Sequence, residues 1–147
     1  MAEIEETNQL LLPLLIESGQ ESVILEEWLG RHLFEINERL IKYKAILFRG
    51  FREVCLDRIS KSIFNELVTY DYRSTPRTSL GKNIYTATEY PKNLSISQHC
   101  ENAYQHCWPM KLLFHCIVPA SSGGKYSISS LLHFTLDTAE PYKGVIM

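Results

Sequence analysis

The most informative stretch of the chain reads Ser97-Gln98-His99-Cys100-Glu101-Asn102-Ala103-Tyr104. If residues 99–101 are extended, the side chains of His99 and Glu101 project to the same face, because side chains alternate along a strand. An imidazole and a carboxylate are two parts of the facial triad, made of two histidines and one carboxylate, that holds ferrous iron. The triplet alone is a weak signal, and by itself favours a surface histidine beside a solvated glutamate.

The first half of the chain predicts an alternation of strands and helices. Residues 10–16 and 45–48 are short apolar runs that favour strands. Residues 26–43 and 53–67 carry apolar side chains at steps of three and four, which is the spacing of one helical face. These positions are Leu25, Trp28, Leu29, Leu33, Ile36 and Leu40 for the first helix, and Leu56, Ile59, Ile63 and Leu67 for the second.

The second half predicts strands and loops. Residues 70–83 are polar and contain Pro76 and Gly81, which indicates a long loop of the kind that is often functional. Residues 84–88, 94–99 and 111–118 are predicted as strands, and residues 121–124 as a turn. The fold class is therefore α+β, and the whole chain, residues 1–147, is interpreted as a single domain.

Composition excludes several classes of partner. The chain has 147 residues and a net charge of -2, so no strong attraction to nucleic acid is expected. No stretch approaches the roughly 20 apolar residues of a membrane helix. The acidic N-terminus, which begins Met1-Ala2-Glu3-Ile4-Glu5-Glu6, is unlike a secretory signal. These features predict a cytoplasmic protein without membrane or nucleic-acid partners.

The cysteines offer an alternative metal site. Cys100, Cys107 and Cys116 lie near histidines in the sequence, which would suit zinc, but their spacing does not match a structural zinc pattern. We expect these thiols, with Cys55, to remain reduced and to pack as small apolar groups.

The surroundings of His99 and Glu101 resemble the TauD/TfdA-type dioxygenase family. In that family a metal-binding histidine and carboxylate, two positions apart, are followed by a Trp-Pro pair before a strand, and then by a turn with two glycines. The matching segments here are residues 97–104, 108–114 and 119–124, with further likeness in residues 45–51, 72–77 and 83–90. The resemblance covers residues 10–124 and is specific in the order and spacing of its motifs.

The resemblance implies a fold, cofactors and a reaction. The fold would be a double-stranded β-helix, or jelly roll, with helices at its N-terminal end. The cofactors would be iron(II) and 2-oxoglutarate, and the reaction would be the hydroxylation of an unactivated C–H bond of a small-molecule substrate. His99 and Glu101 would be iron ligands, no further catalytic residue is assigned, and residues 72–85, including Asn83, would border the substrate pocket.

The resemblance ends at the turn formed by Gly123 and Gly124. The family commonly places there a threonine that helps to hold 2-oxoglutarate, but Tyr126 occupies that position, and residues 125–147 form a divergent C-terminal tail. A change of reading frame after Lys125 is one hypothesis for this divergence.

The family's later metal ligands are also missing from the matched segments. A jelly roll needs eight strands, and about half of them fit between residue 84 and residue 147. The second metal histidine and the arginine that anchors 2-oxoglutarate would then lie beyond the chain, and His133, in unmatched sequence, is not assigned as a ligand. We therefore expect a partial, truncated jelly roll with poor activity by itself, in which an unpaired sheet edge favours self-association. The alternative is a non-catalytic remnant or a binding module of the same fold.

One further residue has two interpretations. Arg49 follows the apolar run at residues 45–48 and could face a pocket. An arginine at the end of a strand more often pairs with a carboxylate, and this is the interpretation that we favour.

Overall fold

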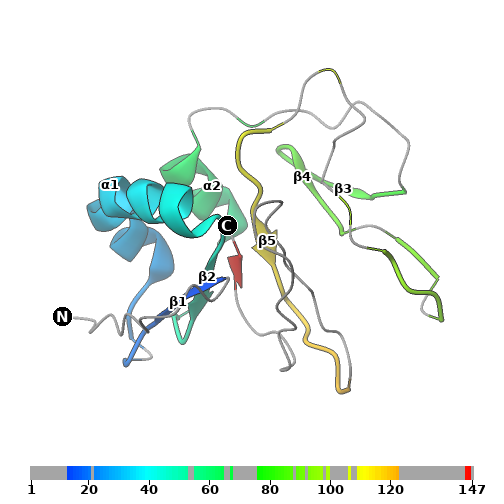
Figure 1. Cartoon of the computed structure of the whole chain (residues 1–147), viewed down its shortest axis with the longest axis horizontal. Coiled ribbons are helices and arrows are strands. Elements are labelled where there is room, and N and C mark those ends of the chain that lie inside the picture. Colours follow the sequence, from blue (N-terminus) through cyan, green and yellow to red (C-terminus); the bar gives the residue numbers. More distant parts are fainter. Residues whose placement is uncertain are drawn as a thin grey trace.

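A computed structural model describes residues 13–20, 22–52, 55–64, 67, 76–87, 89–91, 93–97, 99, 106, 109–122 and 145–146. Two helices lie on the same side of a four-stranded sheet, and a separate two-stranded hairpin lies beside them (Figure 1). The elements are β1 (Leu14–Glu17), α1 (Leu25–Tyr43), β2 (Ile46–Arg49), α2 (Leu56–Ile63), β3 (Ser79–Gly81), β4 (Ile84–Tyr85), β5 (Phe114–His115) and β6 (Val145–Ile146).

Strands β1 and β2 form the parallel pair at one end of the sheet, whose order is β1-β2-β6-β5. Parallel neighbours need a crossover connection, and α1 supplies it. Leu14 pairs with Ile46 and Ile16 with Phe48, and all four side chains are buried. The strand predicted at residues 10–16 is observed as Leu14–Glu17, with Pro13 outside it, and the strand predicted at residues 45–48 is confirmed with a shift of one residue.

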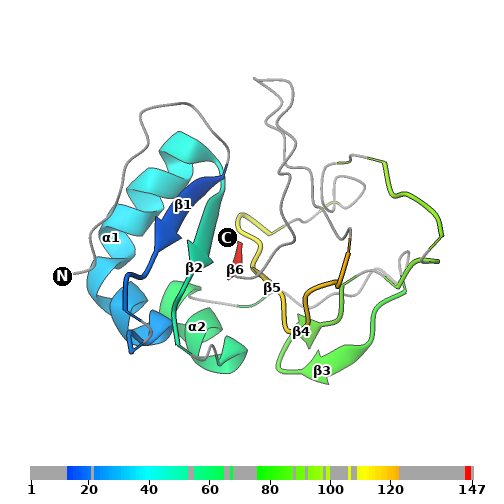
Figure 2. The same cartoon turned by 90° about the horizontal axis from the view of Figure 1, so that it is seen from below.

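The core lies between these strands and both helices, which cover the same face of β1 and β2 (Figure 2). Trp28 of α1 and Phe48 form a T-shaped pair with a centroid distance of 6.3 Å. Phe51, just after β2, completes the aromatic group at 5.6 Å from Trp28. The fully buried aliphatic members of this core are Ile16, Leu25, Leu29, Ile36, Ile46 and Ile59.

Helix α1 confirms the periodicity of the sequence almost to the residue. Glu26 and Glu27 lie in its first turn and Lys42 in its last, which suits the helix dipole. Lys44 ends the helix in the left-handed conformation, with φ of 65°, and its N–H donates to the carbonyl of Leu40 at 2.8 Å.

Helix α2 is shorter than predicted. The predicted range was 53–67, but Cys55 and Phe64 are extended at its two ends. Phe64 leaves the helical conformation and packs against the core, so the apolar pattern that continues to Leu67 is not helical. The packing of the partly buried Phe64 against the core coincides with the end of the helix.

The β-rich half differs most from expectation. The loop predicted at residues 70–83 contains β3, and the strand predicted at residues 84–88 is reduced to Ile84–Tyr85. Lys82 and Asn83 form the two-residue turn between them with φ of 52° and 59°. Positive φ at both central residues matches the twist of a tight hairpin, which is why so short a pair can form.

The strand predicted at residues 111–118 is likewise reduced to β5, Phe114–His115. Strand β6 lies between β2 and β5 and pairs antiparallel with both. Phe114 and His115 pair in this ladder, while Ile117 and Val118 are 72% and 81% exposed. Among the described residues, the apolar run therefore extends beyond its paired part. The α+β class is observed in the described residues, and the jelly roll remains a prediction.

We predict that Phe48→Ala lowers the free energy of unfolding by about 3–5 kcal/mol, because it removes a buried aromatic ring from the centre of the core. Urea denaturation measures this effect. The control is Leu15→Ala on the neighbouring strand, where the side chain is 38% exposed and should contribute less than about 1 kcal/mol. Equal losses in the two variants would contradict this description of the core.

Candidate metal site

His99 lies in an irregular, exposed segment. The segment follows a turn in which the N–H of Leu94 donates to the carbonyl of Pro91 at 3.0 Å. The strand predicted at residues 94–99 is wrong for the part that is described, residues 94–97 and 99. Leu94 and Ile96 are 55% and 51% exposed, so the alternating pattern has no buried face to fix it as a strand.

The ring of His99 is held by its own backbone. Its Nδ1 lies 2.8 Å from the carbonyl oxygen of Ser97. A carbonyl oxygen only accepts, so Nδ1 carries the hydrogen of this bond. A histidine that ligates a metal is commonly oriented by such a bond from its other nitrogen. The donor chemistry of His99 therefore fits a divalent metal.

The partner predicted for His99 lies outside the described residues. This partner is Glu101. Tyr126 and two cysteines of the zinc alternative, Cys100 and Cys107, also lie outside the described residues. The shared face of His99 and Glu101 accordingly stays a prediction. Within the described part of the chain, no group of three or more histidine, cysteine, aspartate or glutamate side chains is gathered in a way that could hold a metal.

The β3–β4 hairpin is joined to the following segment by a polar network. The hydroxyl of Thr78 donates to Oε1 of Glu89 at 2.6 Å, and the hydroxyl of Thr86 donates to the same oxygen at 3.3 Å. The backbone N–H of Glu89 donates to the carbonyl of Pro76 at 3.0 Å. One carboxylate thus fixes the chain where it leaves the hairpin toward His99.

The tip of the hairpin is clipped to α2. Lys82 Nζ donates to Oδ2 of Asp57 at 2.8 Å, and Lys61 contacts the same oxygen at 3.1 Å. Asn83 also donates from its amide to the carbonyl of Leu67 at 3.0 Å. The hydrogen bond from Lys82, followed by that from Lys61, lowers the pKa of Asp57 below its ordinary value. Sequence reasoning missed this clip, because nothing in the pattern relates positions 57 and 82.

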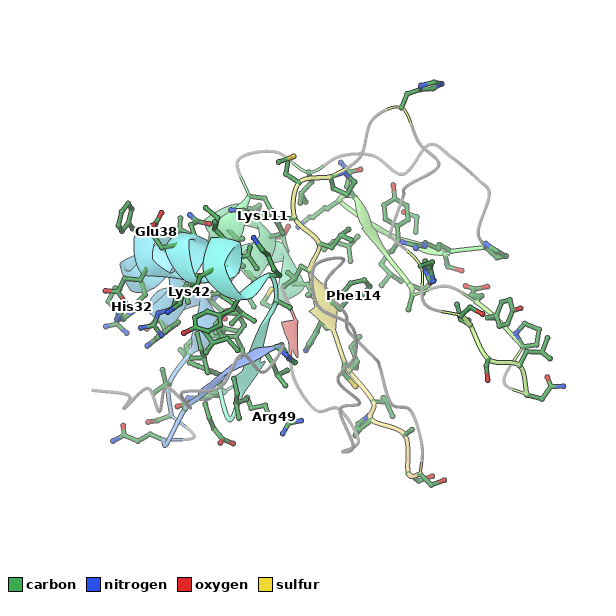
Figure 3. The ribbon with its side chains drawn as sticks, in the orientation of Figure 1. His32, Glu38, Lys42, Arg49, Lys111 and Phe114 are labelled. Atoms are coloured by element: carbon green, nitrogen blue, oxygen red, sulfur yellow. The ribbon has the colours of Figure 1, made fainter. Side chains whose placement is uncertain are left out.

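The segment before β5 is attached to α1. Lys111 Nζ donates to Oδ1 of Asn37 at 2.6 Å, and Leu113 packs against the core. His115 of β5 is half-buried, its Nδ1 has no hydrogen-bond partner, and burial lowers its pKa. Figure 3 shows Lys111 beside α1 and Phe114 on β5.

Arg49 ends β2 on the side of the strands away from the helices (Figure 3). Glu17 of β1 lies next to it in register. The Nε atom of Arg49 is nevertheless buried without a hydrogen-bond partner. The position at a strand end agrees with the sequence, whereas a bond from Nε to a carboxylate is not formed.

The sequence model of the family described as taurine catabolism dioxygenase TauD, TfdA family matches residues 9–137. The chain belongs to the TauD/TfdA family. The match continues beyond Gly124, where the resemblance described above ends, and stops at residue 137. Both the predicted metal pair and the hairpin lie inside it.

Two relatives are similar to the chain. The dapdiamide synthesis protein DdaC of Enterobacter agglomerans is 33% identical over 118 residues, which cover 78% of this chain and 35% of DdaC. A clavaminate synthase-like protein of Arabidopsis thaliana is 35% identical over 88 residues, which cover 57% of this chain and 26% of that protein. The chain thus spans about a third or less of these relatives. No solved structure matches it.

Among the described residues, no helix is long and apolar enough to cross a membrane. Helix α1 has the length but carries charged side chains along its outer face, including Glu27, Arg31 and Glu38.

We predict that Lys82→Met releases the hairpin tip, because it removes the ion pair with Asp57. Hydrogen exchange of the amides in residues 79–85 should become faster. Lys61→Met is the matched control, since Lys61 bonds the same carboxylate from within α2 and does not reach the hairpin. Equal protection in the wild type and Lys82→Met would contradict the clip.

The same clip should depend on pH and on salt. The pKa of Asp57 is lowered in the folded state, so the contact stabilises the protein above the unfolded-state pKa. This stability is lost as the pH falls through the lower, folded-state value. Salt should weaken the contact in the same exchange measurement, because Lys82 is exposed and Asp57 is partly exposed, so ions screen their attraction.

His115 should make the stability of the fold fall on acidification. Its lowered pKa means that the unfolded chain binds a proton more readily, so stability is lost as the pH falls from the unfolded-state pKa toward the folded-state value. The melting temperature of His115→Gln, measured from pH 8 to pH 5, should fall less than that of the wild type. An identical slope would show that burial of His115 is not the cause.

Proposed function

We propose that this chain carries part of the metal site of an iron(II)- and 2-oxoglutarate-dependent dioxygenase, in which His99 and Glu101 are two of the protein ligands. Membership of the TauD/TfdA family supports this assignment. The observation that carries it to a particular residue is the bond from Nδ1 of His99 to the carbonyl of Ser97, which orients the imidazole in the way that is common for a metal-binding histidine.

The bound iron, together with 2-oxoglutarate and oxygen, would supply the oxidant for C–H hydroxylation. In this proposal, the side chains of this chain bind the iron and hold its ligands in orientation. His99 presents one imidazole nitrogen, with its ring fixed by the Ser97 carbonyl. The carboxylate of Glu101 adds an anionic oxygen, which suits a ferrous ion in a mixed nitrogen and oxygen site.

The β3–β4 hairpin would border the substrate. Its connection through Glu89 and its clip through Lys82 hold it at two points. The relatives are named for dapdiamide synthesis and for likeness to clavaminate synthase. Both names concern small molecules, so we propose a small-molecule substrate for this chain as well.

The chain by itself should be a poor catalyst. Tyr126 stands where the family commonly has a threonine near 2-oxoglutarate, so that cofactor should be held less well. A non-catalytic remnant or binding module of the same fold is the second candidate, and the tyrosine at this position favours it.

We predict that His99→Ala and Glu101→Ala each lower the affinity for iron(II) by at least about tenfold. Loss of a residue that only orients a ligand commonly lowers metal affinity by about this factor, and loss of the ligand itself should lower it at least as much. Anaerobic calorimetric titration measures the affinity. His106→Ala is the matched control, since His106 is also exposed and lies nearby in the sequence. No iron binding by the wild type would favour the remnant.

A second assay on the same variants separates binding from catalysis. Succinate release from 2-oxoglutarate with added iron(II) should be slow in the wild type and absent in His99→Ala. Fast release that depends on His99 would contradict the expectation of poor activity. Stoichiometric zinc in the purified protein would favour the cysteine alternative.

A further inference from the structure

The outer face of α1 carries two large apolar side chains in solvent. Phe34 is 79% exposed and Ile41 is 66% exposed, and they lie two turns apart on one stripe of the helix. Figure 3 shows Glu38, from the same stripe, on the side of α1 away from the strands. This outer stripe comprises the exposed residues Glu27, Gly30, Arg31, Phe34, Glu35, Glu38, Ile41 and Lys42.

The charged side chains of the outer stripe form pairs that lie at equal distances on either side of a point between Phe34 and Glu35. In each pair the two charges have opposite signs. Arg31 and Glu38 are equidistant from that point, and so are Glu27 and Lys42 farther out. A twofold axis through the point would bring each positive side chain opposite a negative one. Like charges would meet instead if one member of either pair carried the opposite sign.

We propose that the outer stripe of α1 binds a second copy of this chain as an antiparallel helix pair. Arg31 then faces Glu38 of the partner, Glu27 faces Lys42 of the partner, and both contacts occur twice by symmetry. Phe34 lies next to the axis and packs near its own copy. Glu35, about 100° around the helix from Phe34, lies at the same distance from the axis, on its other side.

Gly30 is consistent with a close approach. It lies on the outer stripe, one turn before Phe34, and no heavy atom lies within 4 Å of the position a Cβ would occupy. A glycine inside a helix lowers its stability relative to alanine, and here it leaves room for side chains of the facing helix. The contact is small and its charges are solvated, so we expect weak association, with Kd on the order of 100 μM.

The same charges also stand four residues apart within one helix, as Glu27 with Arg31 and Glu38 with Lys42, where they can support the helix itself. A charge exchange distinguishes the two roles. Exchanging Arg31 and Glu38 restores the contacts between helices but places like charges four residues apart within each helix. The two accounts therefore predict opposite results for the double variant.

Sedimentation equilibrium over a range of protein concentrations at low salt tests the proposal. Glu38→Arg should raise Kd at least about tenfold, and Arg31→Glu with Glu38→Arg should return it to within about threefold of the wild type. Arg58→Glu is the control, because it reverses a charge of the same size on an exposed residue of α2 outside the outer stripe, and it should change Kd by less than about threefold. Circular dichroism verifies that α1 remains helical in each variant.

The proposal is overturned if the wild type is monomeric throughout, or if the double variant stays as weak as Glu38→Arg. It is also overturned if association is indifferent to all three changes, which would point to the outer strands β1 and β5 instead. None of these outcomes depends on iron binding.

Discussion

The buried parallel pair β1 and β2 is the interaction on which the described structure depends. Four side chains at the centre of the pair, Leu14, Ile16, Ile46 and Phe48, face both helices and are almost fully removed from water. The crossover through α1 and the packing of Trp28 follow from this pairing, because the helix must return along the sheet to cover it. The pair also gives β6, and through it β5, an edge on which to add.

The candidate site is held in a different way. The hairpin residues 79–83 are exposed, so the region is attached through polar contacts more than through apolar burial. Asp57 joins the hairpin tip to α2, and Glu89 joins its base to the segment that leads to His99. Such contacts are sensitive to salt, whereas apolar burial in the core is not, so the two halves of the described structure should respond differently to ionic strength.

The sequence predicted α1 almost completely because its apolar positions repeat over five turns and its packing is local. It failed in the β-rich half, where β5 is only two residues long and depends on a partner far along the chain at Val145–Ile146. His99 was found from its spacing to Glu101, but the extended geometry assumed for it was wrong over residues 94–97 and 99. The bond to Ser97 and the contact between Asp57 and Lys82 have no sequence pattern that would reveal them.

The central claim is that His99 and Glu101 share one ferrous ion. A crystal structure of the protein grown anaerobically with iron(II), with the ion located by its anomalous scattering, tests it most directly. The account predicts one iron within bonding distance of Nε2 of His99 and of a carboxylate oxygen of Glu101. An iron bound elsewhere, or the two side chains on opposite sides of the backbone, would contradict it.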